Sequence, residues 1–218
     1  MKTRTKILLP ILGILLGVGA GFLLLWGLNY FGGKAVDDSF SPSYVQKRFL
    51  KKNENSRPGT ALEDVKNLVI HYVANPGSSA LANRNYFNSL ADPASNPTGL
   101  GASAHFIVGL EGEVIQCIPV TEVAYANYPR NYDTISVEVC HPDESGRFAE
   151  ATYASLVKLT ADLLVFCGLT ESDVIRHYDV SGKLCPKYYV EHPEAWEQLK
   201  EDVRAYMQAH PDIINEMP

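Results

Sequence analysis

The sequence predicts an α/β fold, in which helices flank a central mixed β-sheet, preceded by one transmembrane helix. Short runs of β-branched and aromatic residues alternate along the chain with segments whose apolar residues recur every three or four positions. Strands that alternate with helices in this way favour a layered sheet with helices packed against it. In addition, the N-terminus contains an uncharged run that is long enough to cross a bilayer.

The uncharged run extends from Ile7 to Leu28. A helix of that length would span about 33 Å, close to the hydrocarbon thickness of a bilayer. Basic residues precede the run and acidic residues follow it, so we expect a cytoplasmic N-terminus and an exported remainder. The alternative is a cleaved signal peptide and a secreted protein. Signal peptides usually have an apolar core of about 7–15 residues and a small-x-small cleavage site, so we interpret residues 1–33 as a cytoplasmic stub and a signal anchor.

Residues 34–56 are polar and charged, and are predicted to form an extracytoplasmic stalk. Ser41 followed by a proline is a possible start for a short helix within it. Arg57-Pro58-Gly59 then punctuates the chain. Residues 57–210 remain for one globular domain, which is a common domain size.

Three strand regions are predicted in this domain. Leu68–Tyr72 is a short apolar run, stopped by a Pro-Gly turn. Two alternating runs around Leu110-Glu111-Gly112 predict a hairpin. Thr134–Cys140 places Ile135, Val137 and Val139 on one face and Ser136, Glu138 and Cys140 on the other.

Three helices are predicted around these strands. Ser78 or Ser79 is a suitable cap for a helix that follows the first strand. A second helix has an apolar stripe from Leu156 to Cys167 and ends at Gly168. The last has apolar residues at 196, 199, 203 and 206, with a proline near its first turn.

Charge and cysteine content exclude two classes of protein. After residue 33 the chain has 16 basic and 25 acidic residues, whereas binding to the nucleic acid backbone requires a basic face. The four cysteines are too few and too widely spaced for a disulfide-stabilised miniprotein. Cys117 and Cys140 could pair outside the cell, but spacing alone does not establish a disulfide.

His71, His177 and Cys185 are the candidate metal ligands. His71 ends a predicted strand beside a turn, and Cys185 follows His177 by eight residues. Two imidazoles and a thiolate, with a fourth position open to water, form a known catalytic zinc site. Taken singly, however, a histidine or cysteine of this kind is more often a core residue.

Four blocks of sequence, in order, add a resemblance: LVIHYVANPGSSALANRNYF, SAHFIV, TISVEVC and RHYDVSGKLCP. Together they resemble the type 2 zinc-dependent N-acetylmuramoyl-L-alanine amidases, a family that includes peptidoglycan recognition proteins and T7 lysozyme. The resemblance covers roughly residues 57–203. It implies that His71, His177 and Cys185 bind Zn²⁺.

The same resemblance implies two catalytic residues. Glu138 matches the glutamate thought to act as general base, and Lys183 matches the lysine thought to stabilise the oxyanion. Without it, Glu138 would be interpreted as a solvated strand residue and Lys183 as an ordinary loop residue. The family's A-W-H is AYAN here, so Ala126 replaces a histidine whose contacts are lost or supplied by Asn127 or Tyr128. Ala104 replaces a tyrosine found in T7 lysozyme.

The resemblance implies a membrane-bound amidase that hydrolyses the bond between N-acetylmuramic acid and L-alanine in peptidoglycan. One alternative is a non-catalytic peptidoglycan-binding receptor, although such relatives typically lack a metal ligand. Another is a zinc peptidase that acts on the stem peptide, but the sequence has no H-E-x-x-H motif.

Overall fold

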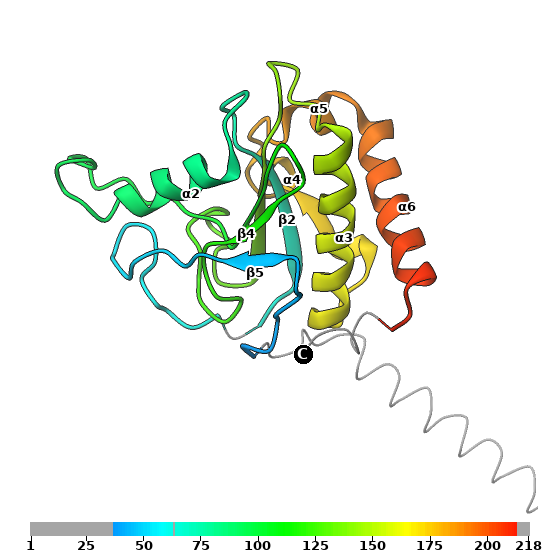
Figure 1. Cartoon of the computed structure of the whole chain (residues 1–218), viewed down its shortest axis with the longest axis horizontal. Helices are drawn as coiled ribbons and strands as arrows, with labels where there is room; N and C mark the ends of the chain where they lie inside the picture. Colours follow the sequence, from blue (N-terminus) through cyan, green and yellow to red (C-terminus); the bar gives the residue numbers. More distant parts are fainter. Residues whose placement is uncertain (1–36, 63, 213–218) are drawn as a thin grey trace, which may run out of the picture. The chain divides into compact units, whose positions relative to one another are not determined.

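A six-stranded mixed sheet forms the centre of the domain (Figure 1). The structure, a computed structural model, describes residues 37–62 and 64–212. The strand order is β1-β4-β3-β5-β2-β6, where β3 and β4 are antiparallel and the other neighbours are parallel. The strands are β1 (Val45–Lys47), β2 (Asn67–Tyr72), β3 (Phe106–Val108), β4 (Val114–Gln116), β5 (Thr134–Val139) and β6 (Val174–Arg176).

The α/β prediction is confirmed for this domain, and the three predicted strand regions correspond to β2, the β3–β4 hairpin and β5. The helices are α2 (Ala80–Ser89), α3 (Glu150–Cys167), the 3₁₀ helix η1 (Glu171–Asp173), α4 (His177–Ser181), α5 (Lys187–Glu191) and α6 (Pro193–Ala209). The predicted membrane anchor lies outside the described residues. None of the helices within the described ranges is long and apolar enough to span a bilayer.

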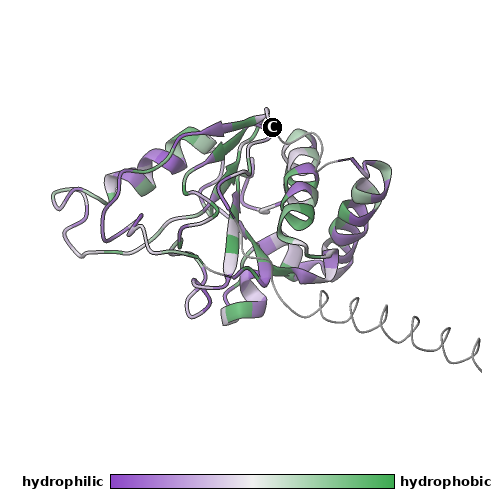
Figure 2. Ribbon diagram, turned by 90° about the horizontal axis from the view of Figure 1, so that it is seen from below, coloured by the Kyte–Doolittle hydropathy of each residue, from purple (hydrophilic) through white to green (hydrophobic). Residues whose placement is uncertain are grey.

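Helices cover both faces of the sheet. The pleat of β5 directs Ile135, Val137 and Val139 into the larger core, together with apolar residues of α3 and α6. Hydrophobic residues extend along most of α3, whereas α6 has much hydrophilic surface (Figure 2). On the opposite face, Ile107 and Ile115 pack in a second core with Phe87 of α2. Because side chains alternate along a strand, residues next to the Ile/Val stripe of β5 face the α2 side of the sheet.

Two of the predicted helix ends have the expected geometry. The Ser79 hydroxyl accepts a hydrogen bond from the backbone N–H of Ala82 at 3.2 Å and caps α2. Gly168 ends α3 with a φ of 68°, a left-handed conformation in which a side chain would be strained.

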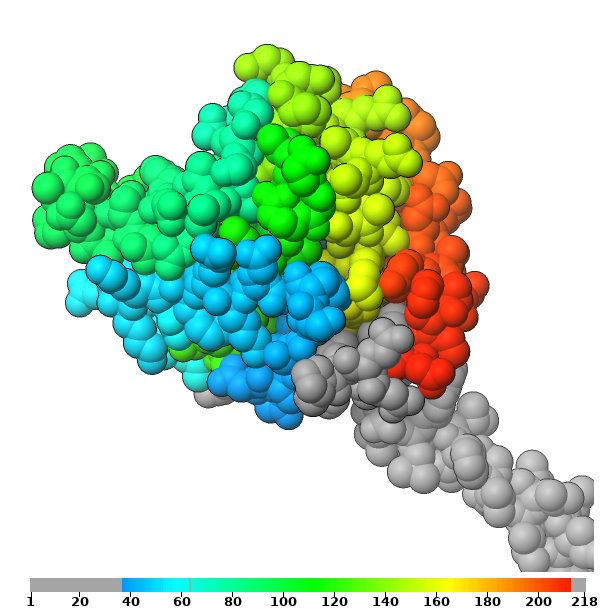
Figure 3. Space-filling model, viewed as in Figure 1, coloured from blue at the N-terminus to red at the C-terminus, as the bar shows by residue number. Residues whose placement is uncertain are grey.

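The prediction of a stalk with a short helix is wrong for the described residues 37–56. Residues Val45–Lys47 form β1, which pairs in parallel with β4 at the edge of the sheet. Phe40 and Leu50 are both buried, and Figure 3 shows this N-terminal part, in blue, packed against later segments of the domain. The segment is polar because an edge strand buries few residues; in β1 only Val45 is buried.

Phe40→Ala is expected to lower the free energy of unfolding by about 3–5 kcal/mol, the usual cost of truncating a buried phenylalanine. The Phe40 ring is 1% exposed and contacts Phe106 and Phe166 edge-on, with centroid distances of 5.5 and 5.3 Å. Urea denaturation measures the effect. Phe49→Ala is the matched control, since that ring is 37% exposed. Equal losses in the two variants would contradict the placement of Phe40 in the core.

Candidate metal centre

The carboxyl ends of three adjacent parallel strands, β5, β2 and β6, form the floor of the candidate site. His71 is the second-last residue of β2, and the register of β2 with β5 places it directly opposite Glu138. Both residues alternate with apolar residues that face α3, so their side chains lie on the α2 side of the sheet. His71 Nδ1 is 3.9 Å from Glu138 Oε1, and the His71 side chain is almost fully buried.

His177 and Cys185 reach the same place from the other side of β2. β6 pairs with β2 up to Arg176, and His177 follows as the first residue of α4. That helix ends at Gly182, and the chain turns back so that the Tyr178 N–H donates to the Cys185 carbonyl at 2.9 Å. Cys185 Sγ is 3.7 Å from His71 Nδ1. One ligand atom from each of His71, His177 and Cys185 lies within 4.8 Å of the other two.

Two buried atoms of this cluster fit a bound cation. His177 Nδ1 and Glu138 Oε2 have no hydrogen-bond partner among residues 37–62 and 64–212. Leaving a polar atom buried and unpaired is unfavourable, and ligation would satisfy the imidazole nitrogen. The donor set, two imidazoles and one sulfur, is of the type that suits zinc rather than calcium or magnesium.

The protonation preferences of the ligands support this interpretation. Burial lowers the pKa of His71 to about 3, and burial followed by the nearby Lys183 lowers the pKa of His177. Both imidazoles are therefore neutral near pH 7, as ligation requires. Burial raises the pKa of the Cys185 thiol to about 12, which disfavours the thiolate unless a cation is bound. Binding of a metal ion and loss of the Cys185 thiol proton are thus expected to occur together.

Glu138 and Lys183 complete the charged lining of the cleft. Burial raises the pKa of Glu138 to about 8, and the Lys183 ammonium opposes that shift. Lys183 extends from the exposed turn after α4. The cleft encloses about 220 Å³. The residues that line it are His71, Tyr72, Phe87, Gly101, Ala102, Ser103, Tyr125, Ala126, Glu138, His177, Lys183 and Cys185.

The family model described as N-acetylmuramoyl-L-alanine amidase matches residues 61–188, which contain all five of the predicted site residues. This chain belongs to that amidase family. The match explains why the four sequence blocks occur together, because they contribute β2, β3, β5 and the β6–α4 segment around one cleft.

Individual relatives agree with the family. The chain is 37% identical over 158 residues to the N-acetylmuramoyl-L-alanine amidase CwlL of Bacillus licheniformis, covering 67% of this chain and 42% of the relative. It is 32% identical over 186 residues to the amidase BlyA of Bacillus subtilis, covering 76% and 48%. This chain thus spans less than half the length of either. Its fold matches the catalytic domain of XlyA with a TM-score of 0.60 and 25% identity, covering 73% of this chain and 98% of that domain.

Ala126 stands where the amidase motif has a histidine, and the sequence left open whether Asn127 or Tyr128 supplies the contacts of that histidine. Ala126 lines the cleft, but the next residue, Asn127, is buried and its Oδ1 lies 2.6 Å from His71 Nε2. Tyr128, the other candidate, is 82% exposed. Asn127 lies in a loop without strand or helix periodicity, so the sequence contains no signal for its contact with His71.

The remaining histidines and cysteines have positions outside the metal cluster. His105 is buried and bonded to Ser136 and to the Glu122 carbonyl, a structural role. Cys117 and Cys140 are both buried free thiols rather than a disulfide.

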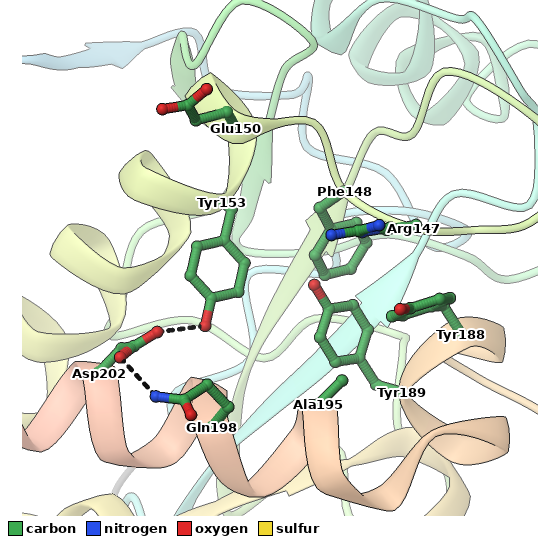
Figure 4. A pocket seen from close by; sticks show the side chains of 9 residues that line it. All are labelled: Arg147, Phe148, Glu150, Tyr153, Tyr188, Tyr189, Ala195, Gln198 and Asp202. Carbon is green, nitrogen blue, oxygen red and sulfur yellow. Dashed lines mark hydrogen bonds between the residues drawn. The ribbon is translucent and has the colours of Figure 1, made fainter.

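A larger hollow of about 590 Å³ is lined by residues of α3, α5 and α6, together with Arg147 and Phe148 (Figure 4). Three of its polar side chains are paired with one another: the Tyr153 hydroxyl donates to Asp202 at 2.6 Å, and the Gln198 amide donates to the same carboxylate at 2.9 Å. None of the nine lining residues is a histidine or a cysteine. The candidate site is therefore the smaller cleft at the sheet edge.

Proposed function

We propose that this chain hydrolyses the amide bond between N-acetylmuramic acid and the L-alanine of peptidoglycan, with zinc as cofactor. The observation that carries the proposal is the convergence of three candidate metal-ligand side chains, a partly buried carboxylate and a lysine on one cleft. Family membership gives the substrate class, since the similar proteins CwlL and BlyA are both named N-acetylmuramoyl-L-alanine amidases.

His71, His177 and Cys185 would hold the zinc ion, which when bound polarises a carbonyl and makes water more acidic. Glu138 is suited to proton transfer. Its Oε2 has no hydrogen-bond partner in the part of the chain that the structure describes, and its raised pKa of about 8 lies near the operating pH of a general base and acid. In this role it removes a proton from the attacking water and later delivers one to the leaving amine of L-alanine.

Lys183 is suited to the charge that develops on the substrate. Its side chain lines the same cleft, and its ammonium acts on Glu138 and on both histidines through space. A fixed cation near the carbonyl oxygen favours the tetrahedral transition state, in which that oxygen becomes negative.

The test is digestion of purified sacculi by residues 34–218, with and without a chelator. An amidase releases intact stem peptides with a free L-alanine amino group, and leaves glycan strands that carry lactyl groups. We expect that release to stop in the chelator and to return on addition of zinc. Cleavage within the stem peptide would instead identify a peptidase, and binding without any release would identify a receptor.

We further propose that residues 1–33 anchor the enzyme in the cell membrane, with the catalytic domain outside. The support is the uncharged run Ile7–Leu28 with basic residues before it. The protein should then fractionate with membranes, and protease added to intact spheroplasts should remove the domain. A mature N-terminus that maps beyond Tyr30 would show a cleaved signal peptide instead.

A further inference from the structure

A chain of three hydrogen bonds connects the backbone before β5 to the outer nitrogen of His71. We propose that Asn127 is a positioning residue, which holds the His71 imidazole in the tautomer that carries its proton on Nε2 and leaves Nδ1 free to bind the metal. The proposal rests on the metal site proposed above, and it is independent of the substrate.

The donor and acceptor roles in this series of hydrogen bonds are determined at the Arg130 end. The Thr134 hydroxyl lies 2.6 Å from the carbonyl oxygen of Arg130, which can only accept, so the hydroxyl donates its single hydrogen there. The Thr134 oxygen is then available only as an acceptor. The Asn127 side-chain atom 2.8 Å away from it must therefore be the amide nitrogen, Nδ2.

That assignment determines what faces His71. With Nδ2 on Thr134, the other end of the Asn127 amide is its carbonyl oxygen, which lies 2.6 Å from His71 Nε2. Two acceptors cannot form a hydrogen bond, so His71 Nε2 must be the donor. A neutral imidazole has one N–H, and the lone pair is therefore on Nδ1. Nδ1 is the atom that lies 3.7 Å from Cys185 Sγ, inside the ligand cluster.

The loop that carries Asn127 is also fixed. The Asn131 Oδ1 accepts the backbone N–H groups of Asn127, at 2.6 Å, and of Ala126, at 3.1 Å. Asn127 is 1% exposed and Thr134 is fully buried, so water does not replace either partner readily. The His71 ring is thus presented to the metal in one orientation and one tautomer before any ligand arrives. Outer partners of this kind typically change metal affinity or activity by about 10–100-fold.

The experiment measures the zinc affinity of the full-length chain by competition with a chromophoric chelator, without substrate. Asn127→Leu keeps the approximate shape but removes the acceptor, and is expected to weaken zinc binding by about 10–100-fold. Asn127→Asp keeps an oxygen toward Nε2, and the Thr134 hydroxyl can turn its hydrogen from the Arg130 carbonyl to the second carboxylate oxygen. This variant is expected to stay within a few-fold of wild type. The absorption spectrum of the Co²⁺-loaded chain gives a second readout, which should change in Asn127→Leu and be restored in Asn127→Asp.

Thr134 supplies a test on a residue that does not touch His71. Thr134→Val removes the acceptor that orients Asn127 and should weaken zinc binding, whereas Thr134→Ser should preserve it. This pair decides the matter even if Asn127→Leu does not fold. Wild-type zinc affinity in folded Asn127→Leu or Thr134→Val would overturn the role of Asn127 alone. A wild-type chain that binds no zinc would overturn the metal site as well, and amidase activity is measured separately from both.

Discussion

Glu138→Gln is expected to lower kcat by about 10²–10⁴-fold, the range typical of losing a general base or acid. The amide has nearly the same shape as the carboxylate, so the packing beside His71 is preserved, but it cannot accept the proton of the attacking water. Glu138 lies opposite His71 in the register of β2 and β5, with one oxygen 3.9 Å from His71 Nδ1 and the other without a hydrogen-bond partner among the described residues. The measurement is kcat on purified muropeptide at matched zinc content.

Zinc stoichiometry and melting temperature should stay at wild-type values in Glu138→Gln, because the carboxylate is not one of the three proposed ligands. Lys183→Met provides the comparison: it keeps the length of an exposed side chain, removes the charge, and should lower kcat by about 10²–10³-fold. A Glu138→Gln enzyme with more than about a tenth of wild-type turnover would rule out the general-base role.

The sequence predicted the parts of the fold that have a strong period. Thr134–Cys140 alternates without interruption, and the structure places its Ile/Val stripe in the α3–α6 core and Glu138 on the other face. Helices α3 and α6 were predictable for the same reason, from a stripe of apolar residues and a glycine or proline at one end. Where only one residue of a strand is buried, as in β1, the period disappears and polarity alone suggested a stalk.

The candidate site was predictable only through its metal-ligating side chains. Two histidines and a cysteine together indicate a metal site more strongly than any one of them alone. In addition, the sequence blocks that contain His71, His177 and Cys185 resemble a known family. β6 was missed because its three residues lack the turn and the second alternating run that marked the equally short strands β3 and β4 as a hairpin. Its pairing with β2 brings His177 beside His71. Asn127 was left unresolved because its contact depends on how a loop closes, which involves Asn131 and Thr134 rather than any period along the chain.

Cys185→Ala is expected to weaken zinc binding by about 10²–10⁴-fold and to abolish activity at ordinary zinc concentrations. Zinc bound to a complete set of four structural ligands contributes about 10–16 kcal/mol, so loss of one ligand removes several kcal/mol. It also removes the sulfur that lies 3.7 Å from His71 Nδ1, leaving two imidazoles to hold the cation. Cys185→Asp keeps an anionic ligand, and should retain weaker binding and part of the activity.

Melting temperatures measured with and without zinc distinguish the loss of a metal ligand from the loss of packing, because only the former changes the stability that zinc adds. A ligand that binds only the folded state stabilises it by an amount that grows with its concentration relative to Kd. The melting temperature of the wild-type chain should therefore rise with added zinc, whereas that of Cys185→Ala should respond little. Cys117→Ala is the matched control, because its thiol is equally buried and lies in the second core rather than in the metal cluster. Cys117→Ala should lose some stability with or without zinc, and its melting temperature should rise with added zinc as much as that of the wild-type chain. If Cys185→Ala kept that rise and a full equivalent of zinc, the thiolate would not be a ligand and the metal site would have to be reassigned.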